Sequence, residues 1–145
     1  MVDIPFPPRA RSMNKFATNW VVALRSGDYP QGSVGDLKSQ SGYCCWGVAC
    51  EISDEGSYQK VENGFHFVLN GEAPVTGHMC VPPFTSIVAP TGLTSLQSNV
   101  LMRLNDGSEP PAGYEERELY REVALYPGDR HTFEEIADVI EGWLS

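Results

Sequence analysis

The stretch Gly42-Tyr43-Cys44-Cys45-Trp46-Gly47-Val48-Ala49-Cys50 holds three of the four cysteines and one of the three tryptophans of this 145-residue chain. Aromatic and thiol side chains suit a buried strand, so we expect residues 43–46 to form a strand in the core. Gly47 then marks a bend or a close approach of two backbone segments, and residues 48–52 are expected to open a short helix. The stretch therefore predicts a strand, a turn and a helix at the centre of the fold.

The simplest interpretation of the cysteines is that they are small hydrophobic side chains of the core, because free cysteine is among the most buried residue types. Disulfides are not expected. The chain begins Met-Val-Asp without an apolar export segment, so we expect a reducing compartment, in which thiols rarely pair.

Two other interpretations give the thiols a chemical role. A structural zinc site would draw on Cys44 or Cys45 with Cys50, His78 and Cys80, but the C-x4-C and H-x-C spacings differ from the short knuckles of strong zinc motifs. A small cysteine-dependent enzyme would use Cys45 or Cys50 with a histidine base, which would be His66, His78 or His131. Spacing alone supports neither, and we expect no metal and no cofactor.

The composition indicates one domain of ordinary size. The chain has 145 residues, of which 41% are hydrophobic, enough for a core without metal or disulfide staples. It has no apolar run of about 20 residues, so no membrane span is expected. The 14 glycines and 11 prolines predict extensive loops.

The charge is negative and unevenly distributed. The net charge is −9, and residues 101–145 carry 11 acidic and 4 basic residues, which is −7 of that total. Direct binding of nucleic acid is not expected, because it requires a basic surface. An acidic face suits a basic partner, including a protein that normally binds DNA. The alternative is that these charges only keep the protein soluble.

The N-terminal half predicts an arm, a helix and a hairpin. Prolines make residues 1–12 an extended arm. Residues 13–26 have a wide apolar stripe, with Ser12 or Asn14 as the N-cap and Gly27 as the stop. Residues 27–42 form a glycine-containing loop able to present amides to an anion.

Residues 53–64 are expected to be turn-like. Residues 65–69 then form a strand that turns at Asn70-Gly71 and pairs with 72–76.

The C-terminal half predicts three helices and one ambiguous segment. A short helix is expected at 84–88, ended by Pro90 and Gly92, and a second begins at Thr94 or Ser95 and closes at 105–107. Residues 115–120 fit a helical turn, whereas 118–126 fit a strand. Residues 132–144 are the clearest helix, because Thr132 and Glu135 form a capping box. The carboxylates of this last helix are expected to be its solvated face.

Four segments resemble a family of small bacteriophage proteins without an assigned activity, notably from phages of actinobacteria. They are W-V-x-A-L-R-S-G-x-Y-x-Q-G at 20–32, C-C-x-G-V-x-C at 44–50, L-N-D at 104–106 and F-x-E-I-A-D-x-I-E at 133–141. The resemblance implies a soluble protein that acts in the cytoplasm of a host bacterium and is encoded by a phage accessory gene. The chain departs from the pattern in a long acidic insertion at about 107–131.

These observations predict a single α+β domain over 13–145, with N- and C-terminal amphipathic helices packed on a small antiparallel sheet. For function we expect a non-catalytic phage accessory protein, active against host defence, that binds and inhibits or sequesters a host component. That component is a host protein or a small signalling nucleotide. Homo-oligomerisation stays open. The residues expected to contact the ligand or partner are Arg25, Tyr29, Gln31, Lys38, Tyr114, Glu115, Glu116, Glu118 and Tyr120.

Overall fold

The computed structural model describes residues 13–32, 35–62, 64–73, 81–108, 117–123, 125 and 128–145. The predicted arm at 1–12 lies outside these residues. In chain order the elements are α1 (Lys15–Ser26), β1 (Lys38–Ser39), β2 (Gly42–Tyr43), α2 (Cys45–Ile52), β3 (Gly56–Val61), β4 (Gly64–Leu69), η1 (Phe84–Val88), α3 (Ala89–Thr91), α4 (Ser95–Asp106), α5 (Arg117–Val123) and α6 (Phe133–Leu144). The predicted α+β class is confirmed.

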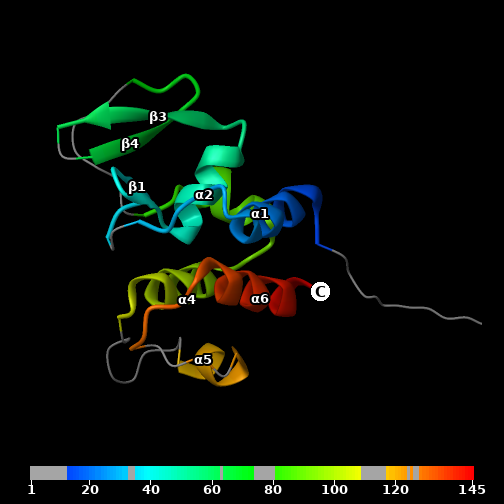
Figure 1. Cartoon of the computed structure of the whole chain (residues 1–145). Helices are drawn as coiled ribbons and strands as arrows, with labels where there is room; N and C mark the ends of the chain where they lie inside the picture. The colour runs from blue at the N-terminus through cyan, green and yellow to red at the C-terminus, as the bar shows by residue number, and fades with distance from the viewer. Residues whose placement is uncertain are drawn as a thin grey trace, which may run out of the picture.

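The elements are stacked in tiers (Figure 1). The β3–β4 hairpin lies at one end, and α2 lies between it and α1, in contact with both. Helices α4 and α6 run side by side beneath α1 and α2, and α5 lies beyond them at the other end. Helix α1 packs against α6, so the first and last helices share one core as the sequence predicts. No helix within the described ranges has the length and apolar character needed to cross a membrane.

Helices α1 and α6 begin where their capping residues predict. The side chain of Asn14 accepts a hydrogen bond from the amide of Ala17 at 2.8 Å, and Gly27 ends α1 in the left-handed conformation. Thr132 and Glu135 form the predicted capping box at the start of α6. Both helix boundaries are thus determined by interactions within a few residues of the chain.

The cysteine-rich stretch at the centre of the core is mostly a helix. The prediction of a strand over 43–46 is wrong beyond Tyr43. Helix α2 starts at Cys45, because the sulfur of Cys44 caps it by accepting a hydrogen bond from the amide of Gly47 at 3.3 Å. The rings of Trp20 and Trp46 stack with centroids 4.4 Å apart, and both side chains are buried. Helix α2 is therefore held against α1 by the two largest side chains of the core.

Gly47 is where two backbone segments approach each other, as predicted. A Cβ atom at this position would lie 1.7 Å from the carbonyl oxygen of Leu37. The amide of Cys44 donates to that same oxygen at 3.0 Å. Only a residue without a side chain fits in this position of the helix.

The hairpin is formed by different residues from those predicted. Strand β4 pairs with β3, in a register from Gly56 opposite Leu69 to Val61 opposite Gly64. Residues 53–64 were expected to be turn-like. Tyr58 instead packs edge to face on its cross-strand neighbour Phe67, with ring centroids 5.3 Å apart, and such aromatic pairs stabilise a sheet. The predicted partner at 72–76 is not a strand at its described residues 72 and 73.

The C-terminal half follows the prediction with small changes. Residues 84–88 are one turn of π-helix that continues into α3, so Pro90 lies inside the helical segment and Gly92 ends it. Helix α4 carries a capping box at Thr94. The ambiguous segment contains the helix α5. Parts of the predicted insertion, 109–116, 124 and 126–127, lie outside the described residues.

Candidate functional site

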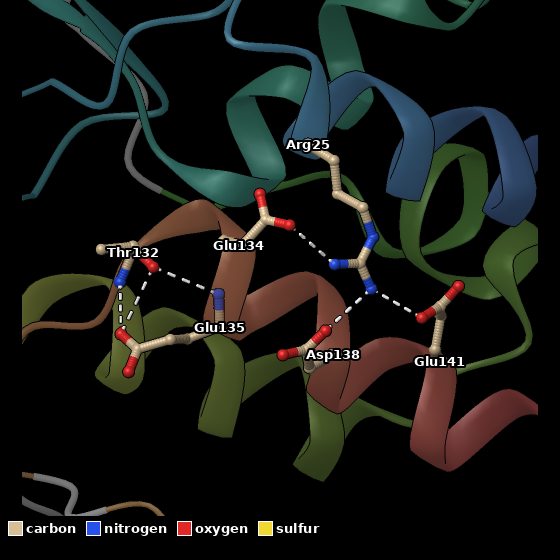
Figure 2. A network of polar contacts seen from close by, with 6 residues as sticks. All are labelled: Arg25, Thr132, Glu134, Glu135, Asp138 and Glu141. Carbon is tan, nitrogen blue, oxygen red and sulfur yellow. Dashed lines mark hydrogen bonds and ion pairs between the residues drawn. The ribbon is translucent and has the colours of Figure 1, made fainter.

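Arg25, one of the residues expected to contact a ligand or partner, points at helix α6. Its guanidinium donates to Glu134 at 3.0 Å, to Asp138 at 2.9 Å and to Glu141 at 2.6 Å (Figure 2). These carboxylates recur every three or four residues, so they form one row along α6. The hydrogen bond to Asp138 is the main reason why the pKa of Arg25 is raised. The carboxylates expected to be only solvated therefore clamp α6 to the end of α1.

Lys38 is enclosed by aromatic rings. Its ammonium nitrogen lies 5.2, 5.0 and 4.7 Å from the ring centroids of Tyr43, Tyr58 and Phe65, and 3.7 Å from a carboxylate oxygen of Glu51. The hydroxyl of Tyr43 donates to the same carboxylate at 2.9 Å. Cation–π contacts thus connect the β1–β2 segment to the β3–β4 hairpin, and the ion pair connects it to α2.

The other two predicted residues of the 27–42 loop also face inward. The ring of Tyr29 packs edge to face on Tyr43, with centroids 5.6 Å apart. The side-chain amide of Gln31 donates to Asn105 at 3.1 Å and to the carbonyl oxygen of His131 at 2.9 Å. The buried Asn105 also accepts a hydrogen bond from the amide of Cys45 at 3.2 Å. The structure does not bring the predicted loop residues together around a ligand cavity; it ties the loop to the core.

The thiols of α2 and its cap are buried, as the core interpretation expects. Burial raises the pKa of Cys44 to about 12 and also raises the pKa of Cys45 and of Cys50. The thiol of Cys45 lies 3.8 Å from the carbonyl oxygen of Leu101, to which it donates. Such thiols stay protonated, whereas a nucleophilic cysteine must be a thiolate.

The zinc alternative depends on two residues outside the described ranges, His78 and Cys80. Among the residues whose positions are described, no group of three or more histidine, cysteine or acidic side chains is arranged to hold a metal ion.

A groove of about 500 Å³ lies between α6 and the segment that contains α5. It combines apolar residues with carboxylates, and its lining is Glu122, Val123, Leu125, Glu135, Asp138, Val139, Gly142 and Trp143. Glu135, Val139 and Gly142 follow one another at spacings of four and three residues, so they share one side of α6. We call this the α5–α6 groove.

The α5–α6 groove is negatively charged. The backbone hydrogen bond at Thr132 is the main reason why the pKa of Glu135 is lowered, so this carboxylate is ionised at neutral pH. Asp138 has one oxygen on Arg25, and in Figure 2 its other oxygen points away from the guanidinium. Glu122 is exposed. The groove thus combines carboxylates with apolar side chains, which suits a ligand that is both cationic and apolar.

The predicted contact residues of the acidic segment have different positions. Glu118 is exposed and forms an ion pair with Arg121 at 3.2 Å. Tyr120, expected to contact a ligand or partner, is only 6% exposed and belongs to the core, because α5 turns it inward. Tyr114, Glu115 and Glu116 lie outside the described residues. The sequence interpretation missed the groove itself, although Val139 among the polar positions of α6 was a signal of a second apolar contact.

Comparison with known proteins places the chain in a family. A family model described as a domain of unknown function (DUF8296) matches residues 13–144, and the chain belongs to this family. No curated protein and no solved structure matches the chain significantly.

Proposed function

We propose that this member of the DUF8296 family is a non-catalytic bacteriophage accessory protein that binds a protein of the bacterial host, in the host cytoplasm, and blocks its action. The observation that carries the proposal is the α5–α6 groove, whose lining combines Glu122, Glu135 and Asp138 with apolar side chains. Protein interfaces combine an apolar centre with a polar rim. The excess of acidic residues in the same part of the chain favours a basic partner and speeds the encounter with it.

A host protein is favoured over a signalling nucleotide. Arg25 and Lys38 are the cationic residues among those expected to contact a ligand, and both are paired with carboxylates. A nucleotide at Arg25 would have to displace three carboxylates and would loosen the contact between α1 and α6. The resemblance to phage proteins supports a host target, because accessory proteins of phages act on their hosts.

A binding role is also favoured over a cysteine-dependent reaction. The thiols of Cys44, Cys45 and Cys50 are buried and have raised pKa values. A nucleophile at any of them would first require opening of the core between α1, α2 and α4.

The proposal is tested with the purified, tagged protein as bait for the lysate of a bacterial host. The wild type is compared with Glu122→Lys, which reverses a charge in the groove. The matched control Glu72→Lys reverses an exposed charge after β4. We expect a host protein that the wild type and Glu72→Lys retain equally and that Glu122→Lys retains at least about ten-fold less, in line with the cost of opposing like charges. Equal retention by all three baits contradicts a groove-dependent function.

Native mass spectrometry of the same preparation tests the nucleotide alternative. We expect the mass of the protein alone or of its complex with a host protein. An excess mass that equals a nucleotide contradicts the proposal and identifies the ligand directly.

A further inference from the structure

We infer that Gly142 is the seat for an aliphatic side chain of the partner, and that arginine or lysine residues flank this side chain at a defined distance. The inference rests on the proposed function and specifies which chemistry the α5–α6 groove selects.

Gly142 is an exposed glycine in the lining of the groove. It lies inside α6, and a Cβ atom built on it meets no other atom within 4 Å. A glycine in a helix is less favourable than alanine, since it gives the unfolded chain more freedom. The fold therefore gains nothing at this position from the missing side chain, in contrast to Gly47, which a neighbouring backbone requires. What the missing side chain does provide is close access to the backbone of α6 from the groove.

The surroundings of Gly142 are apolar. Val139 precedes Gly142 by three residues and lies on the same side of the helix, and Trp143 follows it. Val123 and Leu125 line the groove from the opposite segment. An aliphatic side chain seated over Gly142 thus meets apolar side chains of both segments that line the groove, and a serine in its place loses this apolar contact.

The carboxylates lie at a fixed distance along the helix. Asp138 precedes Gly142 by four residues and Glu135 precedes it by seven, which at the helical rise places them about 6 and 10 Å from it along the axis. An extended peptide advances about 3.3 Å per residue and its side chains alternate between two faces, so a cationic residue two positions from the aliphatic anchor lies on the same face and comes opposite Asp138. The recognised segment therefore has an aliphatic residue with arginine or lysine two positions away.

The test uses two labelled peptides that differ only at the centre. One is Arg-Arg-Gly-Leu-Gly-Arg-Arg, and the other carries serine in place of leucine. Both peptides have the same order of charged residues from either end, so the direction in which they bind does not matter. Their affinities for the full-length protein are measured by fluorescence anisotropy with the wild type, Gly142→Ala, Gly142→Leu, Glu122→Lys and the control Glu72→Lys. Thermal unfolding shows which variants are folded.

We expect the wild type and Glu72→Lys to bind the leucine peptide at least about ten-fold more tightly than the serine peptide, which corresponds to burial of one leucine. Gly142→Leu fills the seat and removes this preference, while Gly142→Ala reduces it partly. Glu122→Lys weakens the binding of both peptides and leaves the preference unchanged.

The outcomes separate the two proposals. Equal affinities for both peptides, or a leucine preference that survives in folded Gly142→Leu, overturns the seat at Gly142 and leaves the acidic groove intact. If Glu122→Lys and Glu72→Lys bind the peptides equally, the charge-based function is overturned. If neither peptide binds the wild type, both proposals fail.

Discussion

We expect substitution of glycine by alanine to destabilise the protein at one helical position and to stabilise it at another. Gly47 lies in α2 and Gly142 in α6, and alanine is the better helix former at both positions by about 1 kcal/mol. The difference between them is in their surroundings. A Cβ at Gly142 meets open space, whereas a Cβ at Gly47 lies 1.7 Å from the carbonyl oxygen of Leu37.

The magnitudes follow from these contacts. We expect Gly142→Ala to raise the free energy of unfolding by about 0.5–1 kcal/mol, and thereby the melting temperature by about 1–4 °C. At Gly47 the contact is about 1.3 Å shorter than the 3.0 Å that real Cβ atoms keep, and both sides are backbone, so no rotamer change relieves it. Tyr58 restrains the helix further, because its hydroxyl donates to the carbonyl oxygen of Gly47 at 2.8 Å. Overpacking of a core usually costs about 1–3 kcal/mol of stability, and the cost is higher when the neighbours cannot move. We therefore expect Gly47→Ala to lower the free energy of unfolding by roughly 3 kcal/mol or more.

The assay is urea unfolding followed by the fluorescence of the stacked tryptophans, with thermal melts of the same variants. A loss of about 3 kcal/mol is a large part of the 5–15 kcal/mol that stabilises an ordinary domain. The reasoning is refuted if Gly47→Ala is as stable as the wild type, which would mean that Leu37 moves freely. Destabilisation by Gly142→Ala would refute the open space beside α6.

Three further predictions concern charges and thiols. Arg25→Met keeps the apolar stem of the side chain but removes its charge. We expect it to lower the free energy of unfolding by about 1 kcal/mol at low salt and by less at roughly 1 M salt. If urea titrations give the same decrease at both salt concentrations, the ion-pair clamp is contradicted. Glu135 has a lowered pKa, so its carboxylate stabilises the fold above the ordinary glutamate pKa and this contribution disappears as the pH falls through the lowered value. Unfolding free energies measured from about pH 7 down to pH 2 should therefore fall more steeply for the wild type than for Glu135→Gln, and parallel curves contradict the capping role. In a Cys80→Ser variant we expect a thiol reagent to label the folded protein slowly and the unfolded protein quickly, and rapid labelling of the folded protein would disprove the burial of Cys44, Cys45 and Cys50.

The site was predicted less well than the fold. Four of the residues expected to meet a ligand, Arg25, Tyr29, Gln31 and Lys38, contact other parts of the chain instead. Each has a partner that is distant in sequence, and the residues next to it in the chain give no sign of such a partner. The α5–α6 groove depends on how α5 is placed relative to α6, and no local pattern specifies that placement.

By itself, the sequence determined the α+β class, the two outer helices with their caps, and the close approach at Gly47. These features depend on interactions within about one helical turn, or on a residue type with a single steric role. The β3–β4 pairing and the cap at Cys44 are local interactions that the sequence patterns did not indicate, whereas the Asn70-Gly71 turn forms as predicted. Tertiary structure decided that Arg25 clamps α6, that Gln31 binds Asn105 and that Lys38 lies among the rings of the hairpin. Such contacts join segments that are distant in sequence, because they bring opposite charges together and pair polar groups, and no pattern within one helical turn specifies them.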